Sequence, residues 1–148
     1  MARIILLDAG PLSMAAHPRK NPEVRAWLQG HLRFQTAVIA VPEIADYEVR
    51  RELLRANKTT GLERLDTLKA TLLYLPLTTE IMLQAAAFWA EMRRSGTPTA
   101  ADTALDGDVI LAATAELLRA RGETVVIATT NVRHLARMAD ARLWQEIV

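Results

Sequence analysis

The 148-residue chain is long enough to bury a substantial core, and we expect residues 1–148 to form a single domain. It is 51% hydrophobic and 24% charged, which is typical of globular proteins, and it contains no cysteine. These features exclude disulfides, thiolate metal sites and a cysteine nucleophile. The net charge of +1 does not by itself indicate a nucleic-acid partner.

The first residues are apolar and carry no basic leader or small-residue cleavage site, so we expect no signal peptide. No apolar run approaches the roughly 18 residues of a membrane span. With the lack of cysteine, this favours a cytoplasmic protein that does not associate with membranes.

Arginine dominates the basic residues. Only Lys20, Lys58 and Lys69 are lysines, so fifteen of the eighteen basic residues are arginines. Arginine forks match phosphate oxygens well, which suits a nucleic-acid ligand. A general preference for arginine codons explains the same bias more simply.

The first third of the chain alternates apolar runs with a helical pattern. Residues 3–7 predict a strand, and Asn21-Pro22-Glu23 then indicates a helix start with asparagine as the cap and proline in the first turn. Residues 35–41, rich in β-branched and small apolar side chains, predict a second strand.

The middle third is predicted to be mainly helical. Pro42 starts a helix to about Asn57, and its apolar face is expected to carry Ile44, Tyr47 and Leu54. Thr60-Gly61 is expected to separate it from a shorter helix whose inward residues are Leu62, Leu65, Leu68 and Leu72. Residues 73–77 predict a third strand.

The last third repeats this alternation. Thr78-Thr79-Glu80 is expected to cap a helix that Gly96 ends, followed by a surface loop over 95–101. The remaining predicted elements are a helix over 106–121 closed by Gly122, a strand over 124–129, a short helix over 132–138 and a strand over 143–148. The fold class is therefore α/β, a three-layer α/β/α sandwich around a mainly parallel sheet.

Polar side chains follow two of the predicted strands. Asp8 follows the first strand, and Asn131 follows the strand over 124–129. Ligands of parallel α/β sheets bind beyond the carboxyl ends of the strands, where the strand order reverses. If these strands are neighbours at that reversal, both side chains face one crevice, although an aspartate at Asp8 also suits a turn or a cap.

Three further carboxylates are candidates. Glu48 lies near the start of a predicted helix, and a solvated helix face explains it equally well. Asp106 and Asp108 flank Gly107 before an apolar run, and one of them, preferably Asp106, is expected to cap a helix. A cluster of acids at one sheet edge is costly unless a cation sits in it, which suggests a divalent-metal site.

Other reactive patterns are weak. The three histidines have no ligand spacing, and no nucleophile elbow or glycine-rich phosphate loop occurs. The three tryptophans are expected to pack in the core or an interface. A receiver-like domain with Asp8 as phosphoryl acceptor is disfavoured because no second aspartate lies two residues on.

Four pieces of the sequence, in order, resemble the PIN domain, the fold of the VapC-type toxin ribonucleases. They are Leu6-Leu7-Asp8, Pro42 followed six residues later by Glu48, the run from Asp108 to Ala115, and Ala128-Thr129-Thr130-Asn131. This resemblance implies a PIN-like domain that cleaves RNA with divalent metal. It implies catalytic roles for Asp8, Glu48, Asp108, Thr129 and Asn131.

The metal implied by the resemblance is Mg²⁺ or Mn²⁺, and its expected ligands are Asp8, Glu48, Asp106 and Asp108. Asn131 replaces the family's usual fourth acid, and Asp106 is an extra carboxylate that can restore the missing charge. Gly10 stands where family members often carry a small polar residue. Arg50, Arg51 and Arg133 are candidates for holding the RNA backbone.

The resemblance further implies the toxin of a type II toxin–antitoxin pair, a cognate antitoxin as partner, and a homodimer. The antitoxin is expected to insert a peptide, with an arginine, into the acidic crevice. The alternative is a PIN-like domain that binds RNA or protein with weak catalysis or none, which the neutral Asn131 favours.

Overall fold

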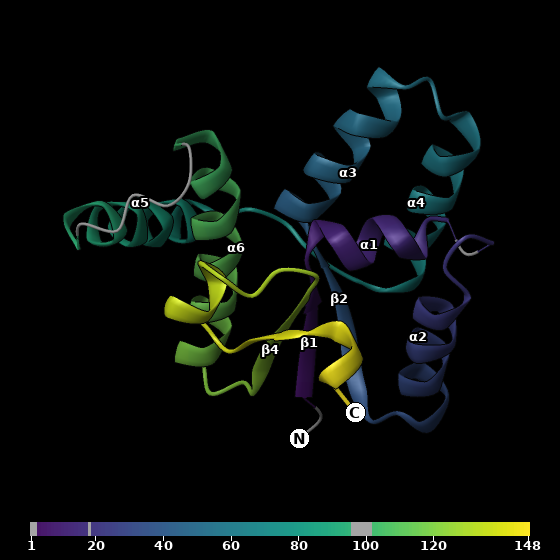
Figure 1. The fold of residues 1–148 in the computed structure, drawn as a ribbon. Coiled ribbons are helices and arrows are strands. Elements are labelled where there is room, and N and C mark those ends of the chain that lie inside the picture. Colours follow the sequence, from purple (N-terminus) through teal and green to yellow (C-terminus); the bar gives the residue numbers. More distant parts are fainter. Residues whose placement is uncertain (1–2, 18, 96–101) are drawn as a thin grey trace.

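The computed structural model describes residues 3–17, 19–95 and 102–148, the last range with side chains from Leu105 onward. Its sheet has five strands, all parallel, in the order β3-β2-β1-β4-β5 (Figure 1). The strands are β1 (Arg3–Leu7), β2 (Ala37–Pro42), β3 (Leu73–Leu75), β4 (Val125–Thr129) and β5 (Ala141–Leu143). The predicted α/β fold around a parallel sheet is confirmed.

Helices cover both faces of this sheet (Figure 1). The α-helices are α1 (Ala9–Ala15), α2 (Pro22–Phe34), α3 (Glu43–Arg55), α4 (Thr59–Thr71), α5 (Thr79–Arg94) and α6 (Asp102–Ala120). Helices α1, α2 and α4 pack on one face, and α6 packs on the other with α5 against its outer side. Helix α3 leaves the carboxyl end of β2 and contributes to the cores on both faces. Two single 3-10 turns, η1 (Leu135–Arg137) and η2 (Trp144–Glu146), lie near the C-terminus.

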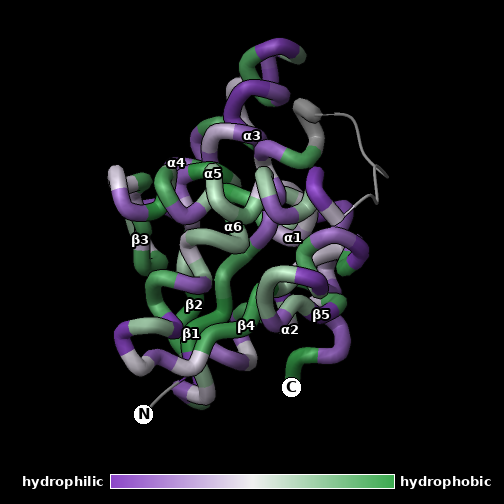
Figure 2. The backbone as a smooth tube through the Cα atoms, turned by 90° about the vertical axis from the view of Figure 1, so that its left-hand side faces the viewer, coloured by the Kyte–Doolittle hydropathy of each residue, from purple (hydrophilic) through white to green (hydrophobic). Residues whose placement is uncertain are grey.

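Strand β1 lies at the centre and is buried on both sides. Its side chains alternate, with Ile5 and Leu7 in the core under α1 and α2, and Ile4 and Leu6 in the core under α6. A central parallel strand therefore reads as a continuous apolar run, as the sequence 3–7 does. Figure 2 shows the same hydrophobic centre along β1, β2 and β4.

Helix α6 begins earlier than predicted. It starts at Asp102, so Asp106 and Asp108 lie inside the helix and the predicted cap at Asp106 is wrong. Gly107, which resembles a helix boundary in sequence, is an interior position here. The other end agrees with the prediction, since Gly122 has a positive φ of 92° after the helix. The predicted loop over 95–101 and its Gly96 lie outside the described residues, apart from Ser95, which ends α5.

The predicted apolar face of α3 is confirmed at Ile44, which is buried, and wrong at the other two residues. Tyr47 and Leu54 are 55% and 56% exposed, whereas Val49 and Leu53 are buried. The predicted break at Thr60-Gly61 is also wrong, because both residues lie in α4, which is as long as α3. A Cβ on Gly61 would lie 2.8 Å from the Leu53 Cδ2 atom, so this glycine allows α3 and α4 to pack closely.

Three further elements differ. Helix α1 was not predicted, and Asn21 does not cap α2, because its amide donates instead to the carbonyl oxygens of Met14 and His17. The predicted helix over 132–138 is the single turn η1. The predicted closing strand exists but lies earlier than expected, because β5 ends at Leu143 and η2 follows it. No helix among the described residues is long and apolar enough to cross a bilayer.

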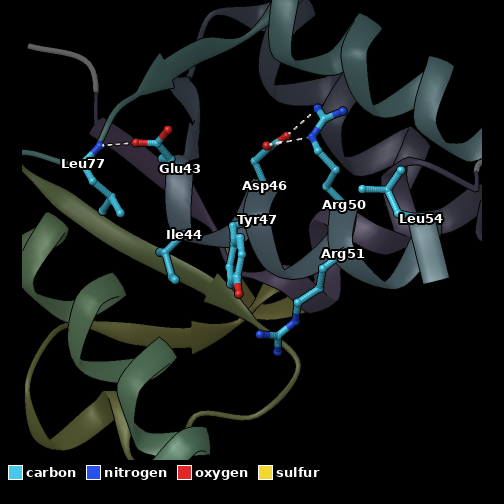
Figure 3. A pocket seen from close by; sticks show the side chains of 8 residues that line it. All are labelled: Glu43, Ile44, Asp46, Tyr47, Arg50, Arg51, Leu54 and Leu77. Atoms are coloured by element: carbon cyan, nitrogen blue, oxygen red, sulfur yellow. Dashed lines mark hydrogen bonds and ion pairs between the residues drawn. The ribbon is translucent and has the colours of Figure 1, made fainter.

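Arg50 joins α3 to α4. Its guanidinium donates to both carboxylate oxygens of Asp46 on α3, at 3.1 and 3.0 Å, and to the Asp66 Oδ1 atom on α4 at 2.7 Å. Figure 3 shows the paired Asp46 and Arg50 side chains. Asp46 is only 6% exposed, so its charge depends on this partner.

We expect Arg50→Ala to lower the free energy of unfolding by about 2 kcal/mol, because it leaves a buried carboxylate without its partner. Asp66→Asn is the matched control, with an expected loss below about 0.5 kcal/mol because Asp66 is exposed. Urea unfolding measures both, and equal losses would contradict the burial argument.

Candidate active site

The pairing of β1 with β4 brings two candidate residues together at the carboxyl edge of the sheet. Leu7 pairs with Ala128, so Asp8 and Thr129 are the next residues along the two strands. The Asp8 amide donates to the Ala128 carbonyl at 2.9 Å, and the Thr129 hydroxyl donates to the Asp8 Oδ2 atom at 2.7 Å. The strand order reverses between β1 and β4, so this contact lies where parallel α/β sheets bind their ligands.

Asp8 is held at both carboxylate oxygens. Its Oδ1 atom accepts a hydrogen bond from the Ala9 amide at 2.8 Å, which makes Asp8 the N-cap of α1. The structural and the functional readings of Asp8 in the sequence are thus compatible. The cap and the Thr129 hydroxyl together fix the direction of the carboxylate.

Glu48 on α3 and Asp108 on α6 act electrostatically on each other and on Asp8. Burial and the charge of Asp8 raise the pKa of Asp108 from 3.8 to about 6. Burial, Asp8 and Asp108 also raise the pKa of Glu48, against a smaller lowering by Arg51. Three residues distant in the sequence therefore form one half-buried acidic group, here called the acidic triad: Asp8, Glu48 and Asp108.

Gly107 lets α6 approach this triad. A Cβ at Gly107 would lie 2.9 Å from the Glu48 Oε2 atom, so only glycine leaves room for the carboxylate at its observed position. Gly107 had no predicted role. The sequence did contain a signal, which was a glycine between two aspartates inside a helical pattern. A glycine weakens a helix at such a position, so its presence there indicates that close packing requires it.

Gly10 has a similar steric role beside Asp8. A Cβ there would lie 2.6 Å from the Thr130 Oγ1 atom, so the side chain of Thr130 occupies this space. The small polar residue expected from the resemblance at this position would need Thr130 to move.

Two predicted site residues lie apart from the triad. Asn131 is exposed, and its Oδ1 atom accepts from the Arg133 amide at 3.2 Å, so its side chain closes a local turn. Its backbone amide donates to the Thr129 hydroxyl at 3.0 Å and so supports the group that holds Asp8. Asp106 is exposed and lines a hollow between α5 and α6 with Met82 and Trp89.

The carboxylate oxygens of the acidic triad suit a divalent ion that keeps most of its water ligands better than an ion that is bound by protein oxygens alone. Among the described residues, no three Asp, Glu, His or Cys side chains lie close enough together to hold one ion directly. The raised pKa values show that the acidic triad is nevertheless close enough for mutual repulsion. Mg²⁺ keeps several waters and needs only one or two carboxylates, so Asp8 with Glu48 or Asp108 suits it.

Two of the arginines that were candidates for RNA contacts have partners within the protein. Arg50 forms ion pairs with Asp46 and Asp66. The Arg51 guanidinium lies 5.2 Å from the Tyr47 ring centre, and Figure 3 labels both of these side chains. The buried His31 is structural, since its ring nitrogens contact the Thr36 hydroxyl and the Ile147 carbonyl. Trp27 packs edge-on against Trp144, as expected for core tryptophans.

A hollow of about 610 Å³ lies along α3, with Glu43, Tyr47, Arg50 and Leu54 among the residues of its wall (Figure 3). None of the acidic triad lines it. This hollow is therefore separate from the acidic triad.

Comparison with known proteins identifies the fold. No protein-family model matches the sequence, and no curated protein matches it. Solved structures do match. VapBC2 from Rickettsia felis, bound to a DNA fragment from its promoter, matches with a TM-score of 0.71. VapBC-1 from nontypeable Haemophilus influenzae and FitAcB from Neisseria gonorrhoeae each match with a TM-score of 0.69.

These structures are 16%, 17% and 19% identical to the chain, and the matches cover 95%, 97% and 97% of it. They cover 98%, 99% and 99% of the matched chains. The chain therefore has the fold of one chain of these complexes, and the predicted PIN-like fold is confirmed.

The raised pKa of Asp108 makes its charge a cost to folding. Its folded pKa of about 6 exceeds its unfolded value, so the penalty is absent below pH 3.8 and complete above pH 6. In EDTA at pH 7.5 we expect Asp108→Asn to be more stable than the parent by about 1 kcal/mol, after allowance for partial exposure, or about 2–4 °C in Tm.

Thermal unfolding between pH 7.5 and 4 checks this, because the advantage of Asp108→Asn must shrink as the pH falls. The exposed Asp106→Asn is the matched control and should gain little. Mn²⁺ should raise the Tm of the parent more than that of Asp108→Asn. An Asn variant less stable than the parent at pH 7.5 would contradict the electrostatic account.

Proposed function

We propose that this protein is a divalent-metal-dependent endoribonuclease. The observation that supports it is the half-buried acidic triad at the reversal of strand order, with Asp8 fixed by the Thr129 hydroxyl. Burial and mutual repulsion both make the charged form of such a group unfavourable, and a divalent cation relieves this. RNA as substrate is favoured by the likeness to VapBC complexes and by the sequence resemblance.

The catalytic roles follow from the positions of the side chains. Asp8, Glu48 and Asp108 supply hard oxygen ligands, and Thr129 keeps one Asp8 oxygen in place. A bound Mg²⁺ or Mn²⁺ supplies an activated water and neutralises charge on the phosphate. In-line attack by water leaves 5′-phosphate and 3′-hydroxyl ends, with no role for the 2′-hydroxyl. Asn131 acts through its backbone amide on Thr129, and Asp106 contributes a more distant negative charge.

We also propose that the protein is the toxin of a type II toxin–antitoxin pair, acts in the cytoplasm and forms a homodimer. The matched structures are complexes named VapBC and FitAcB, which favours a protein partner for this chain. A partner arginine inserted among Asp8, Glu48 and Asp108 relieves the same repulsion as a metal ion does. It therefore competes with the ion and inhibits cleavage.

A second candidate is a domain that binds RNA or protein without catalysis. It is favoured by the lack of a preformed three-ligand cluster in the described part of the chain, and by the neutral Asn131. Titration calorimetry separates the two functions. A non-catalytic domain should bind Mn²⁺ no tighter than its Asp8→Ala variant does.

With Mg²⁺ or Mn²⁺, the purified protein should cut single-stranded RNA, and EDTA should abolish cleavage. Asp8→Asn and Asp108→Asn should each lower kcat/KM by about 100-fold or more, because each removes a charged ligand of the ion. The exposed Asp140→Asn is the control and should leave the rate unchanged. Parent-like cleavage by both triad variants would show that the site assignment is wrong.

The Thr129 hydroxyl has a separate test. Thr129→Val keeps the size of this fully buried side chain and removes the donor to Asp8. We expect about 10- to 100-fold weaker Mn²⁺ binding or activity, as for other groups that orient metal ligands. Thr129→Ser keeps the hydroxyl and should retain most of the activity. If Ser and Val variants lose activity equally, the effect comes from packing and not from the hydrogen bond.

A further inference from the structure

A pocket at the start of α4 gathers cationic side chains outside the acidic triad. It has a volume of about 470 Å³, and its wall includes Lys20, Lys58, Arg64 and His17. Among the described residues, no aspartate or glutamate lines it. We call these four residues and the space between them the basic pocket.

In the part of the chain that the structure describes, Lys20, Lys58 and Arg64 take no part in ion pairs. Within the described ranges, no carboxylate lies within ion-pair distance of Lys20, Lys58 or Arg64. Some other exposed arginines are paired, since Arg55 pairs with Glu52 and Arg142 pairs with Asp140. The positive charge of the pocket is therefore available to a ligand.

The lysines of the pocket are unusual for this chain. Lysine occurs at only three positions, and Lys20 and Lys58 both line this one pocket. Residues 38 positions apart thus meet through folding. A codon preference for arginine explains why lysine is scarce, but it does not explain why two of the three lysines line the same pocket. Lysine binds phosphate as a compact point charge.

The backbone adds to the same potential. Helix α4 begins at the pocket, has no acidic residue in its first turn and has no side-chain cap at Lys58. The positive end of the helix dipole therefore points at the pocket without local compensation. This contribution supports the side-chain charges and does not replace them.

A second hollow extends from the basic pocket to Glu48, one member of the acidic triad. It has a volume of about 460 Å³, and its wall runs from Gly10 and Glu48 to His17 and Lys58. His17 and Lys58 also line the basic pocket, so the two hollows share a boundary. The path follows α1 and α3, which pack together beside α4 (Figure 1). From Glu48 to the end of α3 the helix rises about 10 Å, so the two sites are separated along the path.

We propose that the basic pocket binds a backbone phosphate of the RNA at a position away from the cleaved bond, which rests on the proposed function. A single-stranded polyanion that enters at the acidic triad and follows the second hollow reaches the positive charges of Lys58 and Lys20. The pocket therefore positions the strand and raises its affinity, and it takes no part in bond cleavage.

The test compares Lys20→Gln/Lys58→Gln with Lys69→Gln. Lys69 is the third lysine, near the far end of α4, where its ammonium lies 4.4 Å from the Tyr74 ring centre. In an Asp8→Asn background that prevents cleavage, fluorescence anisotropy measures the Kd of a short labelled single-stranded RNA at several salt concentrations.

We expect the double variant to bind about 10-fold more weakly, and the slope of log Kd against log salt to fall by about 1, since a single-strand phosphate contact contributes about 0.7. In the cleaving protein, the KM should rise with little change in kcat, as for a remote binding contact. Lys69→Gln should change none of these quantities.

The outcomes separate this inference from the proposed function. If the parent cleaves RNA and the double variant keeps the parent KM and salt slope, the pocket assignment is wrong and the nuclease stands. If the parent binds RNA through these lysines but never cleaves it, the pocket stands and the second candidate function replaces the nuclease. If the double variant loses an acidic protein partner but binds RNA normally, the pocket belongs to that partner and the proposal is overturned.

Discussion

The repulsion among the carboxylates of Asp8, Glu48 and Asp108 is the interaction on which the functional account depends. Folding places these groups in a half-buried space, where burial and mutual charge raise the pKa of Glu48 and Asp108. This arrangement lowers the stability of the folded protein, so the rest of the structure must offset the loss. The continuous apolar strand β1 and the cores on its two faces provide that support. A cation at the triad is favourable because it removes a cost that the fold already bears.

The sequence was sufficient to predict the sheet and one end of the site. Residues 3–7 form β1, which is buried on both faces of the sheet. Such a strand appears in the sequence as a continuous run of apolar residues. Asp8 follows it directly, so its place at the carboxyl edge required only the strand assignment. The contact with Thr129 required the strand order as well, which local patterns do not contain. The parallel pairing of β1 with β4 supplies that information.

The helical side of the site was harder to predict because tertiary packing overrides local signals there. Gly61 and Gly107 look like helix boundaries, yet both lie inside helices where a Cβ would collide with a side chain of α3. Tyr47 and Leu54 look like core residues at helical spacing, yet both are exposed on α3. In the sequence, a glycine that allows two helices to pack closely looks the same as a glycine that ends a helix. Only the position of the neighbouring helix distinguishes the two.

The small net charge of the chain conceals a separation of charge along α3. Near its start the helix presents Glu48 to Asp8 and Asp108, and just beyond its end Lys58 lies with Lys20 and Arg64. Between them, Arg55 is neutralised by Glu52, which leaves the two ends as the distinct electrostatic features of this path. A ligand that uses both must carry negative charge along its length and tolerate a cation at one end. A nucleic-acid strand with a divalent ion satisfies both conditions, whereas the composition alone, with its charge of +1, suggests neither.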